Sequence, residues 1–217
     1  MEQQKEYDDC WYKESCKEEC YLCNTYLQMK WQMENSGLPK LMQQPIDMFL
    51  TEDKYAYKQL SEKRLQIVTF TSNGNNLYIC GKHPGTGKTS WAVRMLHTYF
   101  HHMSAGSYGV LRGMFVSVPD LLLKLKDFQN PLSKEYKDNL NNVDLVVWDD
   151  IALTEISDYD YSQLYNYINN RIFARKSNIY TSNITNYDDL QKILGVRLAS
   201  RIWKGSEVIK LTGKGVR

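Results

Sequence analysis

The 217-residue sequence predicts an α/β domain, a parallel sheet flanked by helices, preceded by a small cysteine-rich helical module. Three observations predict this fold class. A glycine-rich loop lies between an apolar strand pattern and an amphipathic helix pattern, β and α patterns alternate after it, and one apolar strand pattern ends in two carboxylates. We place the module and its linker at residues 1–44 and the α/β domain at residues 45–217.

Four of the five cysteines lie close together near the start of the chain. Cys10, Cys16, Cys20 and Cys23 fall within fourteen residues, and Cys20-x-x-Cys23 has the spacing of a tetrahedral zinc ligand pair. In a reducing compartment such a cluster is more often a metal site than a pair of disulfides. We expect the four thiolates to bind Zn²⁺ and so to fold the module, with an iron-sulfur cluster or free redox thiols as open alternatives. Cys80 falls in a strand pattern and is expected to be a buried core thiol.

A helix is expected directly after the cysteines, because apolar residues recur there at helical spacing before a glycine and a proline that act as stop signals. Residues 36–45, which hold that glycine, two prolines and polar side chains, are expected to be the linker. The apolar helix positions are Leu22, Tyr26, Met29 and Met33, and the stop signals are Gly37 and Pro39.

The rest of the chain alternates between strand and helix patterns, which predicts parallel strands joined by helices. Strands are expected at residues 77–80, 110–118, 143–150, 178–183 and 207–211, and helices from about Ser90, from Pro119 and over residues 161–172.

The loop Gly85-Thr86-Gly87-Lys88-Thr89, between the first of these strands and the first of these helices, predicts a phosphate-binding loop. Its glycines let backbone N–H groups approach phosphate oxygens, and the following helix adds the positive end of its dipole. Lys88 is expected to reach the β- and γ-phosphates of ATP, and the Thr89 hydroxyl to bind Mg²⁺. The expected nucleotide-binding residues are Pro84, Gly85, Thr86, Gly87, Lys88, Thr89 and Ser90.

This loop departs from the strict G-x-x-x-x-G-K-T spacing. Lys82 stands where the first glycine belongs, and Gly81 lies one residue earlier. A chance G-x-G-K-T sequence in a protein that binds no nucleotide is the alternative, and the flanking strand and helix patterns disfavour it.

The strand pattern at residues 143–150 ends in Asp149 and Asp150, where an uncompensated charge is costly. A bound metal ion would compensate it. Asp149 is expected to hold Mg²⁺, directly or through water, and Asp150 to polarise the water that attacks the γ-phosphate. The alternative is a solvated turn, which the position roughly 60 residues after a phosphate loop disfavours.

Composition suits a globular protein that is not membrane-bound. Hydrophobic residues make up 42% of the chain, and no run of 18 apolar residues or signal-peptide pattern is present. We therefore expect a cytoplasmic protein.

The charge of the chain is unevenly distributed, although the net charge is only +2. Residues 1–24 hold seven acids and three lysines, and residues 176–217 hold eight Lys or Arg and three acids. The basic end either faces phosphates or an acidic neighbour, or is a solvated surface.

The sequence resembles the AAA+ helicase loaders of the DnaC and DnaI type, especially the compact versions encoded by phages of Gram-positive bacteria. The resemblance covers nearly the whole chain, and the cysteine-rich start is similar to the zinc-bearing domain of DnaI-type loaders. The residues that carry it are Pro84-Gly85-Thr86-Gly87-Lys88-Thr89, Trp148-Asp149-Asp150-Ile151, Thr181-Ser182-Asn183, Arg197-Leu198-Ala199-Ser200-Arg201-Ile202-Trp203 and Leu211-Thr212-Gly213-Lys214-Gly215-Val216-Arg217.

The resemblance implies roles for residues that the spacing alone does not assign. Asn183 resembles sensor 1, which hydrogen-bonds the γ-phosphate or the attacking water. Arg201 looks like the arginine finger that enters the site of the next subunit, with Arg197 as its nearest rival and a surface arginine as the alternative for either. Arg217 is expected either as a late phosphate or DNA contact or as part of a frayed chain end.

Two departures from the family limit the expected activity. Asp150 stands where most AAA+ ATPases carry Glu, so its shorter side chain should activate water less well. Only sixteen residues follow Arg201, too few for a full helical lid domain. We therefore expect a weak ATPase that acts as a switch.

The sequence thus predicts an ATP-dependent loader in DNA replication that uses ATP, Mg²⁺ and Zn²⁺. The resemblance implies that the N-terminal module binds a replicative DnaB-family helicase, that the ATPase domain contacts single-stranded DNA, and that subunits self-associate in a bacterial host cytoplasm. The alternatives are an IstB-like transposition helper ATPase, a nucleotide-binding scaffold and a helicase inhibitor. A small-molecule kinase would leave the Thr181-Ser182-Asn183 strand and the Arg201 segment unexplained.

Overall fold

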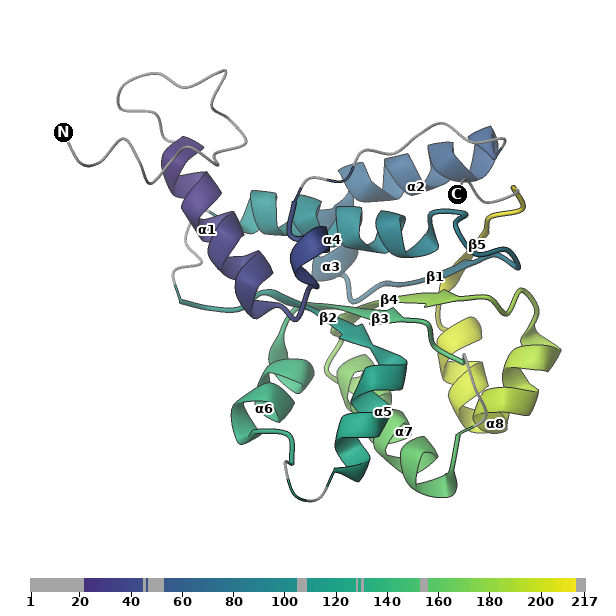
Figure 1. The fold of residues 1–217 in the computed structure, drawn as a ribbon. Coiled ribbons are helices and arrows are strands. Elements are labelled where there is room, and N and C mark those ends of the chain that lie inside the picture. Colours follow the sequence, from purple (N-terminus) through teal and green to yellow (C-terminus); the bar gives the residue numbers. More distant parts are fainter. Residues whose placement is uncertain are drawn as a thin grey trace.

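The computed structural model describes residues 22–44, 46, 53–104, 109–127, 129, 131–152 and 156–213. Its centre is a five-stranded parallel sheet, which confirms the predicted parallel sheet, and the strand order is β2-β3-β4-β1-β5 (Figure 1). Because all strands point the same way, their carboxyl ends share one edge of the sheet. The strands are β1 Asn76–Cys80, β2 Gly113–Ser117, β3 Leu145–Asp149, β4 Ser177–Ser182 and β5 Glu207–Lys210.

Helices cover both faces of the sheet (Figure 1). One buried cluster joins α1, α2, α3 and α4 to one face, and a second joins α5, α6, α7 and α8 to the other. None of the helices in the described ranges has the length and apolar character needed to cross a membrane. The helices are α1 Leu22–Asn35, η3 Lys40–Met42, α2 Lys54–Leu65, α3 Ile67–Ser72, α4 Lys88–Met103, α5 Val118–Lys126, α6 Lys134–Asn142, α7 Asp158–Phe173 and α8 Tyr187–Trp203.

Strand β2 is shorter than the predicted strand at residues 110–118. It ends at Ser117 because that side chain accepts a hydrogen bond from the backbone N–H of Asp120 and so caps α5. Pro119 lies in the first turn of this helix, where its missing N–H costs nothing.

The stretch that follows α1 begins with a contact to the sheet, and the linker expected over residues 36–45 stays a prediction. The backbone N–H of Phe115, on edge strand β2, donates to the Ser36 carbonyl at 2.7 Å. Gln32 of α1 hydrogen-bonds the residues that lead into β2: its side chain donates to the Val110 carbonyl at 2.7 Å and accepts from the Arg112 N–H at 2.9 Å. Gly37 adopts a φ of 82°, so the glycine marks a tight turn rather than a flexible tether. The domain boundary near residue 44 stays a prediction.

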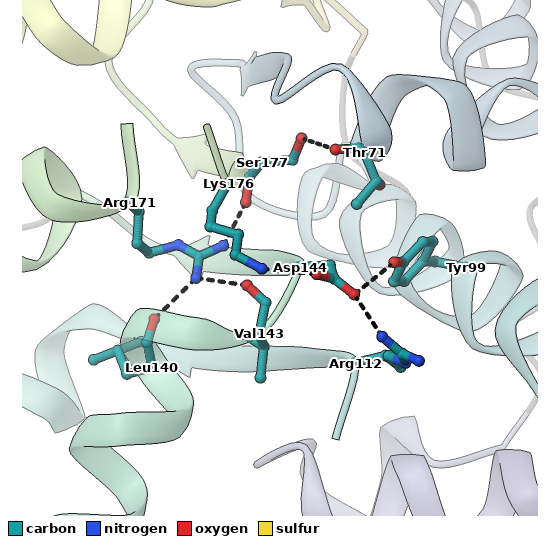
Figure 2. Close-up of polar contacts among 9 residues, drawn as sticks. All are labelled: Thr71, Tyr99, Arg112, Leu140, Val143, Asp144, Arg171, Lys176 and Ser177. Atoms are coloured by element: carbon teal, nitrogen blue, oxygen red, sulfur yellow. Dashed lines mark hydrogen bonds and ion pairs between the residues drawn. The ribbon is translucent and has the colours of Figure 1, made fainter. Parts of the chain in front are cut away.

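An ionic network fixes the amino edge of the sheet (Figure 2). The Asp144 carboxylate accepts hydrogen bonds from Lys176 at 2.8 Å, from the Tyr99 hydroxyl at 3.1 Å and from Arg112 at 3.4 Å. Burial alone would raise the pKa of Asp144, but these donors, Lys176 first, hold it below its ordinary value. The residues just before β2, β3 and β4 are thereby tied together.

Arg171 of α7 completes this edge without a carboxylate contact (Figure 2). Its guanidinium is inaccessible to solvent and donates to the carbonyls of Leu140, Val143 and Ser177 at 2.7 to 2.9 Å. These bonds join the C-terminal end of α6 to β4 at the end of the sheet opposite the phosphate loop.

Candidate functional site

The predicted phosphate loop connects β1 to α4 at the carboxyl edge of the sheet. Gly85 and Gly87 adopt φ values of 76° and 90°, which glycine reaches without steric cost. The Gly81 N–H donates to the Ser182 carbonyl at 3.2 Å, and a Cβ at Gly81 would lie 2.5 Å from the Leu211 carbonyl oxygen. Gly81 therefore begins the loop, which is one residue longer than the strict spacing.

The loop folds around the side chain of Lys88. Its ammonium donates to the carbonyls of Gly81 and His83, both at 3.1 Å, and to the Thr86 hydroxyl at 3.4 Å. Burial lowers the pKa of Lys88, and the negative charges of Asp150 and Asp149 oppose that shift. The predicted phosphate-binding cation is thus held inside the loop by acceptors that phosphate oxygens can replace.

The two predicted magnesium ligands meet although 60 residues separate them. The Thr89 hydroxyl donates to Oδ1 of Asp149 at 2.8 Å, and the Thr181 hydroxyl donates to the same oxygen at 2.6 Å. Burial raises the pKa of Asp149, and the two hydroxyl donors oppose that shift. A hydroxyl and a carboxylate are the hard oxygen donors that Mg²⁺ prefers, so the donor set fits this ion.

Asp150 and Asn183 lie at the same edge. Asp150 has a φ of 55°, and its N–H donates to the Thr181 hydroxyl at 3.0 Å. Asn183 is exposed and follows Ser182, whose register partner is Cys80, the last residue of β1. Both predicted catalytic residues therefore lie at the edge of the sheet where the phosphate loop begins.

Thr181 also belongs to the site, although no motif in the sequence predicts a role for it. It has no exposed surface, lies near the end of β4 and bonds the residues that end β3. A threonine in a buried strand is ordinary, so the only signal in the sequence was its place two residues before Asn183.

Arg201 and Arg197 lie at the opposite edge of the sheet from the phosphate loop. With Asn76, the first residue of β1, they line a groove of about 720 Å³. A five-residue strand spans about 13 Å, so the structure does not bring either arginine to the loop of its own chain. Arg201 instead lies beside Phe173, the last residue of α7.

The predicted zinc ligands Cys10, Cys16 and Cys20 lie outside the described residues, as does Arg217. Cys23 belongs to the first turn of α1, but its side chain is not described. In the described ranges no three His, Cys, Asp or Glu side chains lie together as metal ligands, so the zinc site stays a prediction for the preceding segment. Cys80 is a buried thiol whose pKa burial raises to about 11.

Comparison with known sequences identifies a family and named relatives. Residues 24–217 match the family described as IstB-like ATP binding protein. The replicative helicase loader DnaC of Escherichia coli K12 is 26% identical over 192 residues, which cover 85% of this chain and 74% of that protein.

Solved structures show the same fold. The crystal structure of the DnaC helicase loader has a TM-score of 0.64 and 23% identity, covering 76% of this chain and 95% of that one. The crystal structure of DnaI has a TM-score of 0.64 and 22% identity, covering 83% and 94%. The fold of this chain is thus shared with the DnaC helicase loader and with DnaI.

Proposed function

Because this chain belongs to the IstB-like ATP binding protein family, we propose that it is an ATP-dependent loader of a replicative helicase in DNA replication. One observation carries this proposal. A glycine-rich loop and a carboxylate-ended strand meet through the Thr89–Asp149 hydrogen bond, in a chain that aligns with a named helicase loader over 85% of its length. We further infer the compact phage-encoded type, acting in the cytoplasm of a Gram-positive host.

In this proposal the carboxyl edge binds Mg-ATP. The N–H groups of residues 85–87 and the Lys88 ammonium hold the phosphates, and Thr89 and Asp149 hold the magnesium ion. The ion would offset charge on the phosphate oxygens. Asp150 accepts the proton of the attacking water, and Asn183 hydrogen-bonds the γ-phosphate or that water. With aspartate in place of glutamate, turnover is weak and ATP acts mainly as a switch.

Each site is completed by a second copy of the chain. Arg201 lies at the edge opposite its own phosphate loop, which supports a role in the site of a neighbouring subunit. Such an arginine stabilises negative charge in the transition state and makes turnover depend on assembly.

The N-terminal module, held by zinc on Cys10, Cys16, Cys20 and Cys23, grips the DnaB-family helicase, and the ATPase domain contacts single-stranded DNA. The packing of α1 against α4 supports a mechanical link between the two, because α4 begins at Lys88 in the phosphate loop. Nucleotide state and helicase binding are then coupled through one helix pair.

The family description favours a second candidate, a transposition helper ATPase of the IstB type. A helicase inhibitor would use the same fold and the same partner. The three functions differ in their effect on a replicative helicase: a loader raises unwinding, an inhibitor lowers it, and a transposition helper binds no helicase. An assay of helicase unwinding therefore separates them.

The test is a loading assay with purified components. The chain is mixed with DnaB-family helicases from several bacteria, Mg-ATP and protein-coated circular single-stranded DNA, and unwinding of an annealed strand is measured. A loader raises unwinding and Lys88→Ala does not, whereas an inhibitor lowers unwinding. Absence of helicase binding by a folded protein that binds ATP would overturn the loader proposal and favour the transposition helper.

A further inference from the structure

Thr181 contacts both carboxylate-bearing residues at the end of β3. Its hydroxyl donates to Oδ1 of Asp149 at 2.6 Å and accepts from the N–H of Asp150 at 3.0 Å. Its backbone carbonyl accepts from the N–H of Ile151 at 3.0 Å. We propose that Thr181 is a positioning residue that sets the geometry of the magnesium-binding carboxylate, an inference that rests on the proposed nucleotide site.

The single proton of the Thr181 hydroxyl can point in only one direction. Because an ionised carboxylate and a backbone N–H are an acceptor and a donor, the proton goes to Asp149 and a lone pair faces Asp150. The hydroxyl thereby joins a side chain of the site to the backbone of the next residue, and neither can shift alone.

The turn after β3 needs this support. Asp150 has a φ of 55°, a conformation that residues other than glycine adopt only when the surroundings hold them. Ser182 contributes a second bond to the turn, donating from its hydroxyl to the Ile151 carbonyl at 2.8 Å. The end of β4 thus holds the turn that carries both acidic side chains.

The Thr181 hydroxyl also fixes the position of the Asp149 carboxylate. Its Oδ1 accepts from both Thr89 and Thr181, so the carboxylate is held from two sides. Because the Thr89 proton points at Asp149, the lone pairs of the Thr89 oxygen stay available to a cation. Loss of Thr181 would leave Thr89 as the one hydroxyl donor on this carboxylate among the described residues.

A purely structural role makes a different prediction. Threonine suits strands, and its hydroxyl here also satisfies a buried N–H, so its loss would lower stability without changing the metal dependence of nucleotide binding. Thr181→Val separates the two roles, because valine keeps the volume and the β-branched shape and removes only the hydroxyl.

Thr71→Val is the matched control. Thr71 is also buried, but its hydroxyl has no hydrogen-bond partner among the described residues. It lies at the end of α3, near the amino edge of the sheet. The same substitution there removes a buried hydroxyl that touches no part of the nucleotide site.

The experiment uses the full-length chain without helicase. Binding of a fluorescent ATP analogue is titrated against Mg²⁺ and repeated in EDTA, turnover is measured, and thermal unfolding checks the fold. For Thr181→Val we expect about a 10- to 100-fold higher Mg²⁺ requirement and a similar fall in kcat, since one hydrogen bond to a charged group is lost. Binding in EDTA should be unchanged, Thr181→Ser should restore the parent values, and Thr71→Val should match the parent.

A folded Thr181→Val protein with the parent's Mg²⁺ dependence and turnover would overturn the positioning role. If the valine variant does not fold, Thr181→Ala and Thr181→Ser are compared, and equal Mg²⁺ dependence in these two would overturn it as well. A parent chain that binds no Mg-ATP would overturn the nucleotide site itself. Failure in the loading assay alone would overturn only the loader function.

Discussion

The guanidinium of Arg201 lies over the aromatic ring of Phe173, with 5.1 Å between its central carbon and the ring centroid. Phe173 is 71% exposed, which is unusual for a phenylalanine, and Arg201 is partly buried. A cation over a ring face is stabilised, and the ring restricts where the guanidinium can point. The pair therefore presents an oriented arginine on the outer surface, at the edge opposite the phosphate loop.

The first prediction follows from this position. Arg201→Ala should bind ATP almost normally and hydrolyse it at least about tenfold more slowly, because the proposed finger would act on a neighbour's nucleotide. Mixing it with Lys88→Ala, which lacks a working site but still carries Arg201, should restore part of the turnover. The restored rate should rise with protein concentration and with added single-stranded DNA.

Full activity in Arg201→Ala would make Arg197, which lines the same groove, the candidate for the arginine finger. Full activity in both variants would rule out a site shared between subunits. Phe173→Leu serves as a graded control: it keeps an apolar side chain, removes the ring, and should lower turnover less than Arg201→Ala does.

The second prediction tests the phosphate loop. Lys88→Ala should reduce Mg-ATP affinity or turnover by about 100-fold or more, since it removes a charge-assisted contact to the phosphates. Calorimetric titration with ATP gives the affinity, and circular dichroism checks the fold. Lys134→Ala, which removes an exposed lysine at the start of α6, is the control and should behave like the parent. Parent-like affinity and turnover in folded Lys88→Ala would refute the site.

A third prediction concerns the N-terminal cysteines. Freshly purified, reduced protein should carry about one equivalent of zinc, as four-thiolate sites do. Chelation should unfold the cysteine-rich segment and leave ATP binding intact, because zinc folds only that segment, whereas the phosphate loop joins β1 to α4 within the sheet. Elemental analysis measures the metal, and a variant with Ser at Cys20 and Cys23 should lose it. Visible absorbance with iron would instead identify an iron-sulfur cluster.

Local patterns predicted the elements that build the site. The glycine-rich loop, the apolar strand before it and the carboxylate-ended strand each depend on a few neighbouring residues, so sequence reasoning placed Lys88, Thr89 and Asp149 at one edge. The five parallel strands follow from the same alternation. Helices α2, α3, α6 and α8 were not assigned, because α2 and α6 are largely polar, α3 has only six residues, and Gly195 interrupts α8.

Contacts between residues far apart in the sequence could not be predicted from local patterns. Thr181 meets Asp149 because β3 and β4 are neighbours in a fixed register, and nothing near either residue specifies that pairing. The bend in α8 has a similar origin (Figure 1). Gly195 adopts a φ of 70° there, and glycine in a helix pattern does not by itself predict the new direction that places Arg201.

The last prediction concerns His97, a buried histidine on α4. Burial lowers its pKa to about 4, and a hydrogen bond to the Met42 backbone only partly offsets this, so the ring is neutral in the folded protein at pH 7. In the unfolded chain the pKa is about 6.5. Below that value the unfolded state binds a proton that the folded state excludes, so the stability due to neutral His97 is present above about pH 6.5 and is lost as the pH falls towards 4.

Between pH 7 and pH 5 this loss should amount to about 2 kcal/mol of unfolding free energy. Urea unfolding of the parent and of His97→Gln at both pH values isolates it, because glutamine can keep a backbone hydrogen bond and does not titrate. The parent should lose about 2 kcal/mol more than His97→Gln over this range. His102→Gln, which changes an exposed histidine near the end of the same helix, should lose as much as the parent. Equal losses in the parent and His97→Gln would show that another group governs stability in acid.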